Sequence, residues 1–273
     1  MKARIVVGEG SCGLAAGAGA VYAALETALT PEVPAALGIT GCIGICYLEP
    51  IVDVYDAEGA LHRCVRVKPE DAETIVSAAR ENDYSKLASL LISPEDETFL
   101  SRQTRIALRH CGLIDPENIN EYIGRKGYLA LHKVLTEMTP EQVIQEILDS
   151  GLRGRGGGGF PTGMKWKLAR NIVPDADQKY VCCNADEGDP GAFMDRSVLE
   201  GDPHVVLEAM TIAGFAIGAT QGYIYVRAEY PIAVQRLRIA IKQAREIGML
   251  GKDIFGTGFD FDIDLRLGAG AFV

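Results

Sequence analysis

The chain has 273 residues, of which 48% are hydrophobic, and a formal net charge of −10. This length and hydrophobic content are sufficient for more than one packed domain. The acidic balance argues against nonspecific binding to DNA or RNA, which requires a cationic surface.

Targeting signals and apolar stretches indicate a cytoplasmic protein without direct membrane insertion. Met1 is followed at once by a strand-like segment, so we expect no signal peptide. The seven cysteines then favour a reducing compartment. The most apolar stretch, residues 209–226, contains Thr, Gln and Gly, so a buried helix followed by a strand explains it better than a membrane span. Association with the cytoplasmic face of a membrane complex stays open.

Residues 1–93 show the alternating strand and helix patterns of a small α/β domain. The last helix of this segment has a proline near its first turn and acidic residues beside it, as helix starts prefer. The predicted order is a strand at 3–7, a helix at 15–29, strands at 36–40, 50–56 and 61–67, and a helix at 69–82.

Residues 94–138 are polar, with short helical patterns and turn signals, and are predicted to form a helical connector. A second α/β domain is predicted at 139–273. Its first helix, 140–150, has a clear start, because Thr139 suits the N-cap, a proline follows it, and Gln142 completes the capping-box spacing.

The remaining elements of the second domain follow from apolar periodicity. The run before the acidic loop is predicted to be a buried strand. The expected elements are strands at 178–184, 222–229 and 259–273 and helices at 204–219 and 231–248.

A glycine loop lies within residues 150–166, SGLRGRGGGGFPTGMKW. Gly154, Gly156 and Gly159 satisfy G-x-G-x-x-G, but the dinucleotide fingerprint requires a strand before the motif and here a capped helix precedes it. The Walker A pattern also fails, because Met164 occupies the position where lysine is needed. Neither phosphate-binding motif is therefore present.

The chemical character of this loop still favours a nucleotide. Consecutive glycines allow backbone N–H groups to face one ligand and allow a ring or pyrophosphate to approach the main chain. Arg153, Arg155 and Lys165 supply positive charge suited to phosphate, and Phe160 offers a face for stacking. A flexible linker is the alternative, but linkers are rich in Gly and Ser and lack these flanking residues.

A second loop, residues 183–196, follows a predicted strand with the sequence CNADEGDPGAFMDR. Loops at strand ends are where ligand-binding groups collect in α/β folds. Asn184 can donate and accept hydrogen bonds, and Asp186, Glu187 and Asp189 can accept them from ribose hydroxyls or an amide. A solvated acidic turn explains these residues equally well. A metal loop is disfavoured, because the spacing does not match an EF-hand.

These motifs together resemble a known family. GLRGRGGGGFPTGMKW, CNADEGDPGAFMDR, HVVLEAMTIAGFAIGA, GYIYVRAEY and GAGAF, in this order, are similar to the NADH-binding flavoprotein subunit of respiratory complex I. The same module occurs in NAD-linked hydrogenases and formate dehydrogenases. The resemblance covers residues 105–273 and implies an α/β domain that binds FMN and NAD(H) together.

The resemblance also implies roles for individual residues. Phe160 would face the NADH, and Asp189 occupies a position where the family has an acid near the dinucleotide. The cofactor-binding residues that the resemblance implies are Gly154, Arg155, Gly156, Gly157, Gly158, Gly159, Phe160, Lys165, Asn184, Asp186, Glu187, Asp189 and Phe272.

Two departures from the family pattern are visible. Phe272 stands where the family commonly has a tyrosine beside the nicotinamide. The chain ends at Val273, where the family continues with C-G-E-E, a ubiquitin-like domain and a helical bundle with a [4Fe–4S] cluster. We therefore expect an N-terminal fragment that is inactive by itself, with its FMN- and NADH-binding domain incomplete at the C-terminus.

The cysteines near the N-terminus resemble those of a thioredoxin-like [2Fe–2S] ferredoxin domain. Cys12, Cys42 and Cys46 match three of its ligand positions, but Val7 occupies the fourth. A [2Fe–2S] cluster needs four ligands. Cys64 is the remaining candidate, but its strand pattern directs it to the core. A degenerate domain kept for structure or docking is favoured over a working cluster, and the C-x3-C spacing disfavours a disulfide oxidoreductase.

The sequence thus predicts a subunit that transfers a hydride from NADH to FMN and passes single electrons to iron–sulfur clusters. Its expected partners are other iron–sulfur subunits of a multisubunit oxidoreductase. Hydride transfer to a flavin needs no general base, so no catalytic acid or base is named. The alternative is a non-catalytic docking or assembly module of such a complex. The choice between complex I, hydrogenase and formate dehydrogenase, and between NADH and NADPH, stays open.

Overall fold

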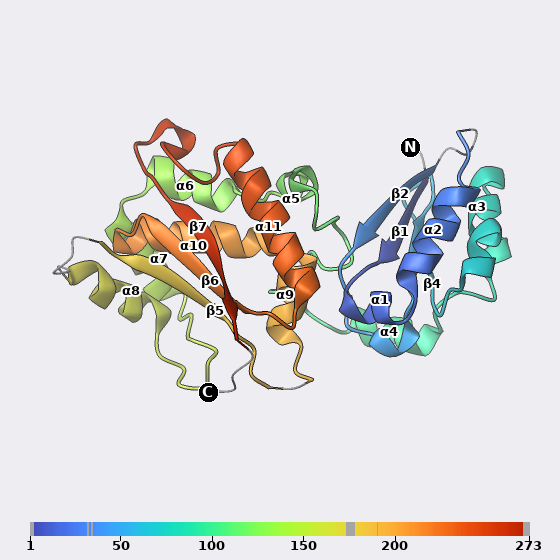
Figure 1. Ribbon diagram of the computed structural model, residues 1–273, viewed down its shortest axis with the longest axis horizontal. Coiled ribbons are helices and arrows are strands. Elements are labelled where there is room, and N and C mark those ends of the chain that lie inside the picture. The colour runs from blue at the N-terminus through green and yellow to red at the C-terminus, as the bar shows by residue number, and fades with distance from the viewer. Residues whose placement is uncertain (1–2, 32, 34, 173–177, 190, 270–273) are drawn as a thin grey trace. The chain divides into compact units, whose positions relative to one another are not determined.

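A computed structural model describes residues 3–31, 33, 35–172, 178–189 and 191–269 (Figure 1). These residues form two compact units. The first is Met1–Pro116 together with Glu200–Asp202, and the second is Glu117–Leu199 together with Pro203–Val273. The connector that we propose at 94–138 is thus shared between the two units.

The first unit contains one mixed sheet with helices packed against it. Its elements are β1 (Ala3–Gly8), α1 (Ser11–Ala15), α2 (Ala18–Ala28), β2 (Ala35–Thr40), β3 (Val52–Tyr55), β4 (Leu61–Cys64), α3 (Ala72–Glu81) and α4 (Pro94–Ser101), with short 3-10 turns at Cys46–Leu48, Pro69–Asp71 and Tyr84–Leu87.

The strand order in this sheet is β2-β1-β3-β4. Strands β1 and β2 are parallel, whereas β3 runs antiparallel to both of its neighbours. A four-stranded sheet in which only the third strand runs against the others has the thioredoxin-like topology. The thioredoxin-like fold expected from the sequence is therefore confirmed.

The core of the first unit lies between the sheet and the helices α2 and α3. Ile5 and Val54 from the sheet meet Leu25 from α2 and Ile75 from α3, and each of these side chains is fully buried. The predicted helix at 15–29 is interrupted. Gly17 adopts a left-handed conformation (φ 104°) that separates α1 from α2, and glycine adopts this conformation without steric cost.

The second unit is built around a three-stranded parallel sheet. Its elements are α5 (Ile119–Gly124), α6 (Leu129–Glu137), α7 (Pro140–Asp149), α8 (Thr162–Asn171), β5 (Tyr180–Ala185), α9 (Met194–Gly201), α10 (Pro203–Ile217), β6 (Gln221–Arg227), α11 (Pro231–Glu246), a 3-10 turn at Ile254–Gly256, and β7 (Asp262–Gly268).

The sheet order is β5-β6-β7, with both strand pairs parallel. Helix α10 packs against β5 and β6 and against α6, α7, α8 and α11, so it is the central element of this unit (Figure 1). This position explains its apolar sequence. None of the described helices is both long enough and apolar enough to cross a membrane.

The start of α7 was predicted correctly. The backbone N–H of Gln142 donates to the Thr139 hydroxyl (3.3 Å), and the backbone N–H of Thr139 donates to the Gln142 side chain (2.7 Å). This reciprocal pair is the predicted capping box. It fixes the start of the helix from which the chain continues to the glycine loop.

The prediction that 178–184 forms a buried strand was wrong in its burial. Strand β5 lies at an edge of the sheet formed by the described residues, and most of its side chains alternate between exposed and half-buried. Tyr180 is 52% exposed. An apolar run indicates a strand, but the neighbouring elements decide how deeply that strand is buried.

A buried polar network holds α5 and α6 against α10. The Glu208 carboxylate accepts hydrogen bonds from the Tyr122 hydroxyl (2.5 Å) and from the backbone N–H groups of Tyr128 (2.9 Å) and Leu131 (3.0 Å). The Tyr128 hydroxyl lies 3.0 Å from Nδ1 of the buried His204. Tyr128 and Leu131 lie at the start of α6, where backbone donors lack helical acceptors.

Candidate functional site

The glycine loop is a narrow hairpin between α7 and α8. Arg153 and Pro161 form an isolated antiparallel bridge. The Gly154 N–H donates to the Phe160 carbonyl (2.9 Å), and the Arg153 guanidinium donates to the Gly159 carbonyl (3.0 Å). These bonds close the base of the hairpin, so its tip projects as exposed backbone.

Two positions in this hairpin require glycine for conformational reasons. Gly157 has φ 97° and Gly159 has φ 58°, and side chains of L-residues rarely tolerate such angles. A Cβ atom at either position would meet no other described atom within 4 Å. The glycines are therefore needed for backbone shape, and they leave the space above the loop open.

A cavity of about 680 Å³ lies between the tip of the hairpin and the loop that follows β5. Asn184 is on β5 itself, and the acidic loop begins directly after the strand's last residue, Ala185. This is the carboxyl end of a parallel strand, where ligands bind in open α/β sheets. The cavity is lined by Arg155, Gly156, Gly157, Asn184, Asp186, Glu187, Gly188, Asp189, Ala192, Met194 and Asp195.

Seven of the thirteen cofactor-binding residues predicted from the sequence line this cavity. The seven are Arg155, Gly156, Gly157, Asn184, Asp186, Glu187 and Asp189. Five others are described but do not line it, namely Gly154, Gly158, Gly159, Phe160 and Lys165. Phe160 is 52% exposed. Phe272 lies outside the described residues.

Glu187 is the only buried carboxylate among the described residues that line the cavity. Its carboxylate accepts hydrogen bonds from the backbone N–H groups of Met194 (2.5 Å) and Arg196 (3.1 Å), which are in the first turn of α9. The Tyr230 hydroxyl lies 3.3 Å from the same carboxylate. A negative group at this position satisfies unpaired helix donors and interacts favourably with the helix dipole. Glu187 therefore anchors α9 to the floor of the cavity.

The acidic loop is also fixed from the neighbouring strand. Arg227, the last residue of β6, donates to the Glu187 carbonyl (2.5 Å). The Asn184 side chain accepts the backbone N–H of Asp186 (3.0 Å), which forms a local turn at the end of β5. These contacts preorganise the loop on two adjacent strands.

Met194 and Asp195 line the cavity but were not predicted as site residues. They belong to α9, a helix whose start the sequence interpretation included in the acidic loop. Asp195 is half-buried, and its pKa is raised mainly by burial and further by the charge of Glu187. The available signal was their place in the FMDR end of the acidic motif.

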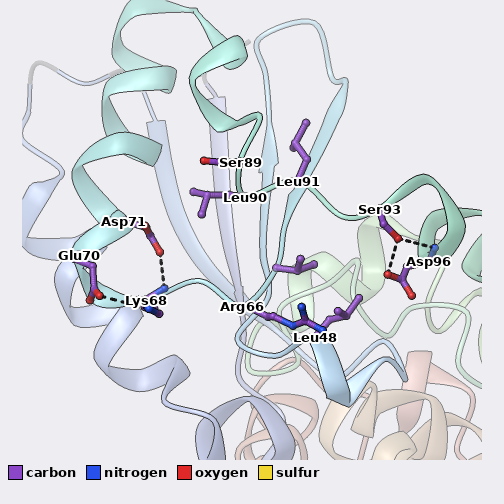
Figure 2. A pocket seen from close by; sticks show the side chains of 11 residues that line it. Leu48, Arg66, Lys68, Glu70, Asp71, Ser89, Leu90, Leu91, Ser93 and Asp96 are labelled. Atoms are coloured by element: carbon purple, nitrogen blue, oxygen red, sulfur yellow. Dashed lines mark hydrogen bonds and ion pairs between the residues drawn. The ribbon is translucent and has the colours of Figure 1, made fainter.

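A second hollow, of about 570 Å³, lies in the first unit (Figure 2). Several of its charged side chains are engaged locally. The Lys68 ammonium lies 4.0 Å from Glu70, the Lys68 backbone N–H donates to Asp71 (2.8 Å), and the Ser93 hydroxyl donates to Asp96 (2.7 Å). This mixed and locally satisfied lining contrasts with the cavity of the second unit, where one cationic side chain faces several acids.

The cysteines predicted as metal ligands converge in the first unit. The Cys42 and Cys46 sulfurs are 3.5 Å apart, and the Cys12 thiol is hydrogen-bonded to Cys46. Cys64, by contrast, is fully buried in the core, and burial raises its pKa to about 12. Among the described residues, no group of three or more His, Cys, Asp or Glu side chains is arranged to hold a metal ion.

The second unit thus defines an α/β protein with a polar cavity at the carboxyl end of a parallel strand. Residues 147–273 match the family described as the Nuo51 FMN-binding domain. Over this segment the chain belongs to that family, and the resemblance found in its motifs is confirmed.

Curated relatives extend the match to somewhat more of the chain. The NADP-reducing hydrogenase subunit HndC of Solidesulfovibrio fructosivorans is 64% identical over 172 residues, which are 63% of this chain and 34% of the relative. One subunit of the NADH-quinone oxidoreductase is 49% identical over 156 residues in Aquifex aeolicus and 44% identical over 161 in Escherichia coli, covering 57% and 58% of this chain and 36% and 35% of the relatives. The chain spans about a third of the length of these proteins.

Solved structures show two likenesses at low identity. An air-oxidised NAD⁺-reducing [NiFe]-hydrogenase matches with a TM-score of 0.46 and 24% identity, covering 99% of this chain and 43% of the other. A thioredoxin-like [2Fe–2S] ferredoxin from Aquifex aeolicus matches 34% of this chain with a TM-score of 0.28 and 23% identity, covering 97% of the ferredoxin.

Proposed function

We propose that this chain provides the FMN- and NAD(H)-binding part of an NADH:acceptor oxidoreductase subunit. The observation that carries the proposal is the cavity that joins Arg155–Gly157 to the Asn184–Asp189 loop, in the segment that matches the FMN-binding domain family. When bound, FMN accepts a hydride from NADH and delivers electrons singly to iron–sulfur centres.

The residues of the cavity fit a flavin mononucleotide. A volume of about 680 Å³ is within the range of small-molecule sites, roughly 300–1,000 Å³. The lining contains one cation, Arg155, beside exposed glycine backbone, and its acids are on the opposite loop. A ligand with one anionic end and a long polar, uncharged remainder matches this distribution of charge.

The distribution also assigns an orientation to the ligand. Arg155 and the backbone of Gly156 and Gly157 would hold the phosphate, because they supply positive charge and unhindered N–H groups. Asn184 and Asp186 would bind uncharged hydroxyl or amide groups, since a phosphate beside carboxylates would be repelled. Glu187 acts by positioning α9.

The wider context of this activity follows from the relatives. HndC is by name a subunit of an NADP-reducing hydrogenase, and the Aquifex aeolicus relative is by name a subunit of an NADH-quinone oxidoreductase. We propose that this chain likewise works with iron–sulfur subunits of a multisubunit oxidoreductase. A cytoplasmic location and an NADH rather than NADPH substrate are parts of the same proposal, the first resting on composition and the second on the acidic lining of the cavity.

Flavin reconstitution tests the proposal. The protein is incubated with FMN, separated from free flavin, and its bound flavin is measured by visible absorption and by fluorescence. We expect tight binding to the wild type and a large loss in Arg155→Glu and Asn184→Ala. Arg238→Glu, a charge reversal on the exposed face of α11, is the matched control and should retain wild-type occupancy.

Anaerobic addition of NADH to the reconstituted protein tests the oxidoreductase part. Bleaching of the flavin absorption supports hydride transfer at this site. Because the chain spans about a third of its relatives, the measurement is repeated on the full-length product of the gene. Absence of bound flavin in both proteins would refute the site and favour a non-catalytic docking role.

A further inference from the structure

Three thiols meet at one end of the sheet in the first unit. The Cys42 and Cys46 sulfurs are 3.5 Å apart, and Cys46 is also hydrogen-bonded to the Cys12 thiol. Their exposures differ, because Cys42 is buried whereas Cys46 is exposed to solvent. A buried thiol beside an exposed one is an arrangement in which two sulfurs can react in succession.

This thiol set does not fit a [2Fe–2S] cluster held by four cysteines. Val7, at the position of the missing ligand, is fully buried in the core on β1. Cys64, the remaining candidate in the first domain, is fully buried in the same core, and its raised pKa of about 12 keeps it protonated. A cluster needs four ligands, and a protonated thiol in the core cannot supply one. Three thiols are therefore left for another chemistry.

We propose that Cys42 and Cys46 form a reversible dithiol/disulfide couple that exchanges with a low-molecular-weight disulfide. A disulfide requires the two sulfurs to approach to about 2.05 Å, so the couple closes by a movement of roughly 1.5 Å. The segment between them contains Gly44, which has φ 95° and open space around it, since a Cβ atom there would meet nothing within 4 Å. The loop therefore has room for this movement.

The surroundings of Cys42 suit it as the second of the two reacting thiols. The Gly44 backbone N–H donates to the Cys42 sulfur (3.3 Å), a contact that favours the thiolate form. Burial has the opposite effect and raises the pKa of both Cys42 and Cys46. Both thiols are thus protonated at rest, and the exposed Cys46 is the one that can lose its proton directly to water.

The exchange proceeds in two balanced steps. The Cys46 thiolate attacks one sulfur of the external disulfide, which forms a mixed disulfide and releases one thiolate. The Cys42 thiolate then attacks the Cys46 sulfur, which forms the Cys42–Cys46 bond and releases the second thiolate. The two protein thiols lose two electrons and two protons, and the external disulfide gains both.

Thiol counting in defined redox buffers tests the couple. The full chain is equilibrated with mixtures of reduced and oxidised dithiothreitol, quenched in acid, labelled with a maleimide mass tag, and analysed by mass spectrometry. The wild type is expected to lose two of its seven thiols at a single midpoint. Peptide mapping should place the new bond between Cys42 and Cys46.

Variants assign the reacting thiols. Cys42→Ser and Cys46→Ser should each abolish the loss of two thiols, whereas Cys12→Ser should retain it. Cys182→Ser is the matched control, because it removes an exposed thiol from β5 and leaves the three thiols of the first unit intact. In Cys42→Ser, Cys46 should still form a mixed disulfide with an added small disulfide, which shows that the variant is folded and its exposed thiol reactive.

Three results would overturn the proposal. The first is a wild-type chain that keeps all seven thiols under oxidising conditions. The second is a disulfide that persists in Cys42→Ser or disappears in Cys12→Ser, since another pair would then be reacting. The third is two irons and two sulfides per chain in anaerobically purified protein, roughly the content of one bound cluster, which would occupy these sulfurs.

Discussion

The buried carboxylate of Glu187 accepts the backbone N–H of Met194 at 2.5 Å and so joins the acidic loop to the first turn of α9. This contact gives Glu187 a positioning role that its place in an acidic ligand-binding motif did not suggest. The residue lines the cavity, but its oxygens also serve the helix that forms the cavity floor.

Removal of this carboxylate should destabilise α9. In Glu187→Ala, buried helix donors lose their acceptor, at a cost of about 1–3 kcal/mol in the free energy of unfolding. Glu187→Gln keeps an acceptor oxygen and should lose less. Urea unfolding followed by the fluorescence of Trp166, the single tryptophan and a residue of the second unit, measures this difference. Wild-type stability in Glu187→Ala together with loss of FMN would instead indicate a direct ligand contact.

Gly157 should be required for flavin binding because of its backbone conformation. At φ 97° a valine is strained by at least about 1–2 kcal/mol, and the hairpin tip must change shape to relieve it. We expect Gly157→Val to abolish FMN binding while the protein stays folded. Gly124→Val, at an exposed glycine with ordinary φ and open space around it, is the control. Wild-type flavin occupancy in Gly157→Val would sink the assignment of the loop.

Glu49 should make the first unit less stable as the pH rises. Burial raises the pKa of this carboxyl from 4.5 to about 7, with Asp53 adding to the shift and the Ile51 N–H opposing it. The folded state therefore holds a proton that the unfolded state releases above pH 4.5. The resulting stabilisation is complete below pH 4.5 and is lost as the pH rises through 7, by an amount on the order of 3 kcal/mol.

Glu49→Gln tests this dependence, because an amide cannot ionise. The variant should be more stable than the wild type at pH 8 and should lack the decline between pH 4.5 and 7. Amide hydrogen exchange of peptides from β1 and β3 reports on the first unit alone. Glu58→Gln, at an exposed glutamate, should behave as the wild type. Equal slopes in Glu49→Gln and wild type would show that another group titrates.

The sequence predicted those features that depend on local chemistry. The Thr139–Gln142 capping box required only the right residues at a fixed spacing, and it formed as expected. The proximity of the glycine loop to the acidic loop followed from a family resemblance that preserves five motifs in order. The thioredoxin-like topology followed from a resemblance in the spacing of the N-terminal cysteines.

The features that were missed depend on contacts between distant segments. Helix α9 starts inside the acidic motif because Glu187, seven residues earlier, satisfies its first donors, and no periodicity reports such a contact. Helix α8 was hidden by the adjacent glycines, and its buried Gly163 fits closely against Leu148 of α7. The exposure of β5 depends on what covers the sheet edge, which an apolar run cannot specify.

His204 should give the second unit the opposite pH dependence. Burial lowers the pKa of its imidazole from 6.5 to about 4, only partly countered by Gln243. The unfolded state therefore binds a proton below pH 6.5 that the folded state refuses until the pH approaches 4. Stability is complete above pH 6.5 and falls as the pH decreases toward 4, by a few kcal/mol.

Trp166 fluorescence during urea unfolding, at about pH 7.5 and about pH 4.5, measures this loss on either side of the His204 transition. His204→Gln should reduce the loss, because an amide does not take up a proton in this range. His132→Gln, at an exposed histidine of α6, should leave it unchanged. A wild-type unfolding free energy that does not change between these pH values would show that His204 is charged or accessible in the folded state, contrary to its burial beside Tyr128.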